Sequence, residues 1–309
     1  MRGGSLIFVR RKNMKEIVIN IENLKKSYGN YVAVNDISFE IKAGEIFGLL
    51  GPNGAEKTSI LECIEGIRTP DSGKIDVGGY NPQVDSQKMH KVLGVQLQSS
   101  GLPLTMTVKE AIDMFSNYHK VSPNHEIISK MGLKNKLNKK YRELSGGEKT
   151  KLILALAIMH KPKILILDEP TAALDVQSRV DLHEVMKTLR YNGTAILLAT
   201  HDMAEAEKLC NRIAVILKGK IIKIGTPNEI TSSGSTISKI SVRTVNDSLK
   251  ETDAKFEDDY YIYSSKDLGE KVNEIINTIN SKGDSLVDLR IERQSLEEKF
   301  IELTSEGRN

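Results

Sequence analysis

The chain has 309 residues, a length that predicts about two domains. Hydrophobic residues make up 39% and charged residues 28% of the chain, which excludes a disordered or fibrous protein. The net charge of +3 is too small for the basic surface that nucleic-acid binders carry, so we expect no nucleic-acid partner.

The first residues carry no pattern of a folded element. We expect residues 1–13 to be an unstructured leader, because the apolar run 6–9 is too short for a signal peptide. We also expect translation to start at Met14, because codons for Arg2, Gly3 and Gly4 could form a purine-rich ribosome-binding sequence. No apolar run reaches the roughly 18 residues of a membrane span. Cys63 and Cys210 form no disulfide framework and match no metal-ligand spacing, which predicts buried free thiols in a reducing compartment.

The N-terminal elements lead into a glycine-rich turn. Apolar and polar residues alternate over residues 17–21 and 34–41, a pattern typical of half-buried strands. The apolar run 45–50 then enters the turn at Gly51, and a helix is expected over residues 58–67. A strand, a glycine-rich turn and a helix in this order form the context that a phosphate-binding loop requires. A short strand follows at 74–77.

The middle of the chain alternates helices with buried strands. Residues 107–142 have helical periodicity, and a Ser-Gly-Gly turn starts a long apolar helix that reaches about His160. The apolar runs 164–167 and 195–199 suit parallel strands buried on both faces. We also expect a helix at 203–209 and a hairpin of strands at 213–217 and 221–224.

The C-terminal part differs in charge from the rest. A linker is expected at residues 231–235, and residues 235–309 carry 11 basic and 16 acidic side chains. The pattern predicts a small α+β module, with strands, one amphipathic helix and a last helix opened by the capping box of Ser295 and Glu298. The strands are expected at 240–245, 260–263 and 287–291, and the amphipathic helix at 268–279.

The glycine-rich turn has the composition of a phosphate-binding loop with one departure. Its residues are Gly51, Pro52, Asn53, Gly54, Ala55, Glu56, Lys57 and Thr58. Backbone N–H groups of such a loop surround phosphates, while Lys57 would reach the terminal phosphates and the Thr58 hydroxyl would bind Mg²⁺. Taken alone, a turn that simply caps a helix explains the loop equally well.

Three other groups of residues support the phosphate chemistry. Asp168 and Glu169 follow a buried strand, where Asp168 can hold Mg²⁺ through water and Glu169 can orient or deprotonate an attacking water. Ser145, Gly146 and Gly147 open a helix whose N-terminus can accept a phosphate. His201 lies just beyond a strand end and could hydrogen-bond a terminal phosphate.

With these motifs in order, residues 17–230 resemble the ATP-binding subunit of an ABC transporter. The resemblance identifies the Walker A loop (51–58), the Q-loop Gln98, the signature 144–148, Walker B (164–168), the catalytic Glu169, the D-loop 173–175 and the switch His201. By the same resemblance, Tyr28 stacks on adenine, Ser59 adjoins the nucleotide, and Thr58, Gln98 and Asp168 bind Mg²⁺. Glu169, His201 and Gln98 are the expected catalytic residues.

The resemblance also implies a fold and partners. The fold is α/β: a P-loop ABC-type ATPase domain over residues 14–234 with a helical subdomain at about 99–160, followed by a C-terminal α+β accessory domain at 235–309. Such ATPases form head-to-tail dimers, homo- or heteromeric, and engage a membrane permease at the cytoplasmic face. The Gln98 loop and residues 99–107 are the expected docking surface. The tail 289–300 resembles the drug- and antibiotic-export branch.

Glu56 stands where the loop pattern has glycine. Its side chain crowds a backbone that should touch phosphate, and each like-charge pair at ~5 Å costs roughly 3 kcal/mol at an effective dielectric constant near 20. The sequence leaves open whether Glu56 is a variant or a native degenerate site that a partner ATPase compensates. Two hypotheses therefore stand: an ATPase that drives export with reduced nucleotide affinity, and a regulatory or asymmetric-partner subunit that does not hydrolyse ATP. A DNA-repair or translation ABC protein is disfavoured, because tandem ATPase units and long coiled coils are absent from the sequence.

Overall fold

The computed structural model describes residues 16–96, 101–172, 174–232, 238–292 and 295–306. Its contacts divide the chain into two compact units, one up to Ile224 and one from Gly225 onward, and each is described by itself. No helix in these described ranges is long and apolar enough to cross a membrane. The predicted leader, the Gln98 position and most of the predicted linker lie outside the described residues.

A six-stranded sheet forms the centre of the first unit. Its strand order is β5-β6-β7-β3-β8-β9, and all the pairs from β5 to β8 are parallel. The strands are β3 (Ile46–Leu50), β5 (Leu93–Gln96), β6 (Ile164–Asp168), β7 (Ala195–Thr200), β8 (Arg212–Leu217) and β9 (Lys220–Gly225). Strands β3, β6 and β7 are buried throughout, as expected of parallel strands covered on both faces.

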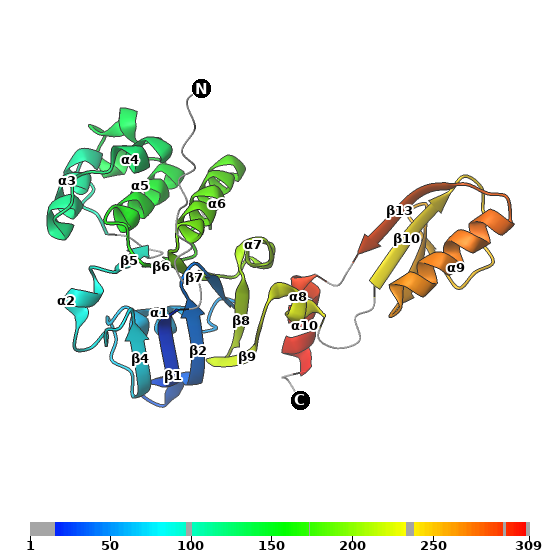
Figure 1. The fold of residues 1–309 in the computed structure, drawn as a ribbon, viewed down its shortest axis with the longest axis horizontal. Helices are drawn as coiled ribbons and strands as arrows, with labels where there is room; N and C mark the ends of the chain where they lie inside the picture. Colours follow the sequence, from blue (N-terminus) through cyan, green and yellow to red (C-terminus); the bar gives the residue numbers. More distant parts are fainter. Residues whose placement is uncertain (1–15, 97–100, 173, 233–237, 293–294, 307–309) are drawn as a thin grey trace, which may run out of the picture. The chain divides into compact units, whose positions relative to one another are not determined.

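A second, antiparallel sheet shares the core of the first unit (Figure 1). Its order is β2-β1-β4, formed by β1 (Ile17–Tyr28), β2 (Tyr31–Lys42) and β4 (Ser72–Val77). Strands β1 and β2 extend further than the alternating pattern predicts, up to the pair Tyr28 and Tyr31. At their outer ends Tyr28, Tyr31 and Val32 are exposed, so backbone pairing rather than burial holds this last part of the ladder.

Helices lie around these sheets. They are α1 (Lys57–Ile64), α2 (Ser86–Met89), α3 (Val108–His119), α4 (His125–Lys130), α5 (Gly146–Ile158), α6 (Val176–Tyr191) and α7 (Met203–Leu209). Helices α3, α4 and α5 group together, with α3 packed on α5, within the region predicted as a helical subdomain (Figure 1). Helix α1 ends before the predicted residue 67, because Gly66 takes a positive φ of 78° that stops the helix.

The second unit contains a four-stranded sheet of order β11-β12-β10-β13, covered by one helix. Its elements are α8 (Pro227–Thr231), β10 (Ser238–Thr244), β11 (Lys255–Glu257), β12 (Tyr260–Ser265), α9 (Leu268–Ser281), β13 (Leu286–Glu292) and α10 (Leu296–Glu306). Helix α8 packs on α10, which is why the unit begins at Gly225, earlier than the linker that the composition predicts.

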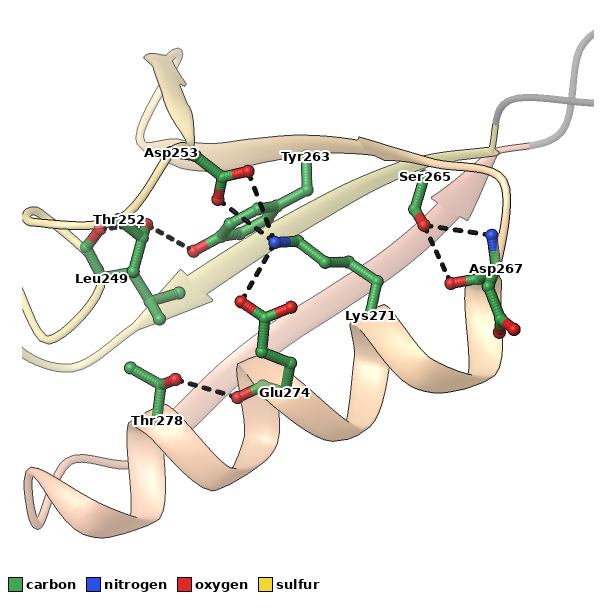
Figure 2. A network of polar contacts seen from close by, with 9 residues as sticks. All are labelled: Leu249, Thr252, Asp253, Tyr263, Ser265, Asp267, Lys271, Glu274 and Thr278. Carbon is green, nitrogen blue, oxygen red and sulfur yellow. Dashed lines mark hydrogen bonds and ion pairs between the residues drawn. The ribbon is translucent and has the colours of Figure 1, made fainter.

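A charged cluster fastens α9 to the sheet of this unit (Figure 2). The Lys271 ammonium donates to Asp253 at 3.2 Å and to Glu274 at 3.1 Å, and it lies 5.0 Å from the centre of the Tyr263 ring. The Lys271 side chain is 14% exposed, but Asp253 and Glu274 are 74% and 60% exposed, so solvent screens both ion pairs as it does at a surface.

Candidate functional site

Three strand ends bring the candidate site together at one edge of the parallel sheet. Leu50 at the end of β3 pairs with Thr200 at the end of β7, and Asp168 at the end of β6 pairs with Ala199. The next residue, Glu169, donates its N–H to the Ala199 carbonyl at 2.9 Å. The glycine-rich loop, the two carboxylates and His201 therefore leave the sheet at the same edge, where ligands of parallel sheets bind.

The loop after β3 wraps around the Lys57 ammonium. Lys57 Nζ donates to the carbonyl of Gly51 at 2.7 Å and to that of Pro52 at 3.2 Å. A Cβ at Gly51 would lie 2.6 Å from the Ile216 carbonyl oxygen, so this close approach requires glycine. Burial lowers the pKa of Lys57, while Glu169 and Asp168 act in the opposite direction.

Two carboxylates face the loop. Burial raises the pKa of Asp168, and the neighbouring Glu169 adds to this, while a hydrogen bond from the Thr58 side chain opposes it. Thr58 and Asp168 thus present a hydroxyl and a carboxylate oxygen side by side, the type of donor that Mg²⁺ prefers. Glu169 Oε1 lies 3.8 Å from Lys57 Nζ and accepts a hydrogen bond from His201 Nδ1 at 2.9 Å.

The backbone of Glu169 is strained. Its φ of 48° is in the left-handed region that a residue with a Cβ rarely adopts. The N–H bond to Ala199, the ion pair with Lys57 and the hydrogen bond from His201 hold the residue in this conformation. Strain of this kind is concentrated at functional sites, and here it directs the carboxylate toward the loop.

Glu56 adopts the backbone conformation of the glycine it replaces. Its φ of 69° and ψ of 22° are left-handed, at the N-cap of α1, where its side chain makes no capping bond. The carboxylate instead accepts hydrogen bonds from the Tyr31 hydroxyl at 2.9 Å and from the Ser59 hydroxyl at 3.1 Å. Tyr28 Oη donates in turn to Ser59 Oγ at 3.3 Å.

The Ser-Gly-Gly turn lies at the start of α5, apart from the loop contacts. The Ser145 hydroxyl accepts the Glu148 N–H at 3.2 Å, and Glu148 accepts the Ser145 N–H at 3.1 Å, so the pair forms a capping box. Among the described residues, no hydrogen bond joins Ser145, Gly146 or Gly147 to the loop at 51–58. Gln98 and Ala173 of the predicted Q-loop and D-loop lie outside the described residues.

The sequence does not predict the buried hydrogen-bond network that lies beneath His201. The Thr200 hydroxyl accepts the Asp202 N–H at 3.0 Å and donates to Glu205 at 2.9 Å, and Glu205 is 3.0 Å from the His183 ring. These contacts hold the turn that carries His201. Of these residues only Asp202 has a signal in the sequence, since an aspartate is a typical N-cap for α7. His183 belongs to α6, which is separate in sequence, so its contact with Glu205 cannot be predicted from local pattern.

Comparison with known proteins agrees with this geometry. A family model described as ABC transporter matches residues 34–172. The chain is 36% identical over 240 residues to the linearmycin resistance ATP-binding protein LnrL of Bacillus subtilis (strain 168). This match covers 75% of this chain and 77% of that protein. It is 38% identical over 224 residues to the Nod factor export ATP-binding protein I of Rhizobium leguminosarum bv. viciae, which covers 71% of this chain and 72% of that protein.

Solved structures confirm the predicted fold class. The structure of an ATP binding subunit of an ABC transporter aligns with a TM-score of 0.66 at 24% identity, over 70% of this chain and 92% of that one. A nucleotide-free ATP-binding cassette from an ABC transporter aligns with a TM-score of 0.61 at 20% identity, over 68% of this chain and 92% of that one. Since relatives more than a third identical match over most of their length, the chain belongs to the ABC transporter family, as an ATP-binding ATPase subunit.

Proposed function

We propose that this chain hydrolyses ATP to drive export through a separate membrane permease. The observation that carries the proposal is the position of Glu169, whose carboxylate contacts both the loop lysine Lys57 and the strand-end His201. A carboxylate beside a phosphate-binding lysine can orient or deprotonate the water that attacks a terminal phosphate. The histidine fixes the orientation of that carboxylate.

The other side chains would bind the nucleotide. Lys57 and the backbone N–H groups of the loop would neutralise the phosphates, and the Tyr28 ring would stack on the base. Thr58 and Asp168 would hold Mg²⁺, which when bound adds positive charge beside the phosphate oxygens. The donor chemistry fits, because both ligands are oxygen atoms and they already hydrogen-bond to each other.

The direction of transport and the partners rest on the relatives. Two of them carry the names linearmycin resistance and Nod factor export, which support an export-type transporter. We infer that the chain pairs with a second ATPase subunit, so that the signature at Ser145 of one subunit completes the nucleotide site of the other. We also infer that a permease docks at the Gln98 loop and residues 99–107, with the chain at the cytoplasmic face of the membrane.

Glu56 reduces the nucleotide affinity in this proposal without abolishing it. Its negative charge adjoins the phosphate loop, and a residual repulsion of about 1.4 kcal/mol weakens binding tenfold. The same residue favours the alternative function, an ABC-fold regulatory or asymmetric-partner subunit that does not hydrolyse ATP. The intact set of Lys57, Asp168, Glu169 and His201 favours hydrolysis.

Steady-state ATPase activity separates the two functions. We expect the purified chain, assayed with its permease in membranes, to release phosphate from Mg-ATP, and Glu169→Gln to reduce the rate by at least about a hundredfold, because the water loses its base. Glu184→Gln is the matched control, since Glu184 is an exposed carboxylate on α6. A rate of the unmodified chain that equals both that of Glu169→Gln and the background without protein would support the subunit that does not hydrolyse ATP.

A further inference from the structure

The Glu56 carboxylate is held by two hydroxyl groups that belong to different elements. Tyr31 begins β2 and donates to Glu56 Oε1 at 2.9 Å, and Ser59 in the first turn of α1 donates to Glu56 Oε2 at 3.1 Å. Each carboxylate oxygen thus has its own donor. In the described residues, the Lys57 ammonium bonds the carbonyls of Gly51 and Pro52 and contacts Glu169, so it does not pair with Glu56.

These two hydrogen bonds matter because a negative charge at position 56 of the loop can weaken phosphate binding. Glu56 occupies the left-handed conformation at φ 69° that the loop requires, so its backbone follows the course that a glycine would follow. What remains is the carboxylate, which a phosphate ligand would repel if the side chain turned toward the loop N–H groups. The two hydroxyls supply the hydrogen bonds that would otherwise have to come from water or from the loop itself.

We propose that Tyr31 is a positioning residue that, with Ser59, fixes the Glu56 carboxylate so that it does not turn toward the N–H groups of the phosphate-binding loop. The loop N–H groups and Lys57 then remain available to an anionic ligand despite the glutamate. Tyr31 is 53% exposed, so we assign its effect to the hydroxyl that bonds Glu56. This inference rests on the proposed nucleotide binding, because it concerns the affinity of the same loop for phosphate.

A double-mutant cycle tests the inference on the full chain. The four proteins are the unmodified chain, Tyr31→Phe, Glu56→Gly and the double variant, and the measurement is the Kd of Mg-ATP by titration calorimetry. We expect Tyr31→Phe to raise the Kd about fivefold, because the carboxylate loses one charge-assisted hydrogen bond and turns more often toward the ligand. Combined with Glu56→Gly, the same change should alter the Kd less than about twofold. We also expect Glu56→Gly to bind Mg-ATP more tightly than the unmodified chain.

Ionic strength gives a second measurement that a purely structural role of Tyr31 would not affect. The weakening caused by Tyr31→Phe should shrink between low salt and about 0.5 M salt, because the repulsion that it exposes is screened. Tyr191→Phe is the matched control, since Tyr191 on α6 is 85% exposed and lies at the far end of a different element.

The outcomes separate this inference from the proposed function. An equal loss of affinity from Tyr31→Phe with Glu56 and with its glycine replacement would overturn the inference, because Tyr31 would then touch the nucleotide directly. No loss in either case would overturn it as well. If none of the four proteins binds Mg-ATP, both the inference and the proposed ATPase function fail. If they bind Mg-ATP but the effects of Tyr31→Phe and Glu56→Gly are independent, only the inference fails.

Discussion

Glu65, at the C-cap of α1, is a buried acid without a hydrogen-bond partner. It is 4% exposed, and neither of its carboxylate oxygens has a partner among the described residues. Burial raises the pKa of Glu65 to about 8, and the charges of Asp168 and Glu62 act in the same direction. The carboxyl is therefore protonated at neutral pH, which lowers the free energy needed to bury it.

The raised pKa predicts a loss of stability at alkaline pH. Because the folded chain binds a proton at Glu65 that the unfolded chain releases near pH 4.5, the free energy of unfolding falls as the pH rises from 4.5 to about 8. Glu65→Gln should remove this slope and stabilise the protein at pH 9 by on the order of 3 kcal/mol relative to the unmodified chain.

Urea unfolding of both proteins at pH 7 and pH 9 measures this difference. Of the histidines that line the adjoining cavity with Glu65, burial lowers the pKa of His119 and of His160, so these two stay neutral in that interval. Burial lowers the pKa of His160 further, to about 4. Parallel curves for the two proteins would contradict the assignment of the slope to Glu65.

The residues of the site differ in how well the sequence reveals them. Lys57, Thr58, Asp168 and Glu169 belong to short motifs whose spacing is local. The sequence therefore places the first two at the start of a helix and the two carboxylates at the end of a strand. Glu65 carries no such signal, because a glutamate at a helix end is usually exposed. Its burial arises from β5, α3 and α5, which lie 28 or more residues further along the chain. The role of each residue stays a prediction until activity is measured.

At the scale of elements, β5 lies unusually close to α5. A Cβ at Gly94 in β5 would lie 2.2 Å from the Ala157 carbonyl oxygen in α5 and 3.0 Å from Pro162. The obstacle is backbone, which cannot rotate away as a side chain would. Glycine at this position therefore sets the separation between the strand and the helix.

Gly94→Ala should accordingly destabilise the first unit by about 1–3 kcal/mol, because strand and helix must separate to admit the methyl group. The free energy of unfolding by urea measures this effect. Gly101→Ala is the control, since a Cβ at Gly101 meets nothing within 4 Å. If the two variants are equally stable, the close approach of β5 to α5 is not a constraint on folding.

The elements that the sequence predicts well have strong local signals. The apolar run of α5 follows a capping box, and α7 has the same bounds, Met203–Leu209, as the prediction. Helix α6 has 16 residues but was not predicted, because its buried face contains only Leu182, His183 and Met186. Apolar residues on its exposed side, such as Val176 at 81% and Tyr191 at 85% exposure, blur the periodicity.

At the scale of the whole molecule, the change in net charge along the chain indicates two modules, but it does not define where they meet. Helix α8, which the sequence did not predict, belongs with the C-terminal unit because its Ile230 is fully buried and α8 packs on α10. That contact joins residues about 70 positions apart, and only the folded structure shows it. Each unit has its own hydrophobic core, without residues shared between the two clusters.

Separate cores predict separate unfolding transitions. Ile275 on α9 is 2% exposed and packs in the core of the C-terminal unit, so Ile275→Ala should destabilise this unit by about 2–4 kcal/mol. In differential scanning calorimetry of the full chain, one transition should move to lower temperature by about 10 °C or more, while the other and the Mg-ATP affinity stay unchanged. Val245→Ala, at a position 64% exposed in the same unit, should move neither. A joint shift of both transitions would mean that the two cores unfold as one cooperative body, in which case a substitution in the C-terminal unit would also weaken nucleotide binding at physiological temperature.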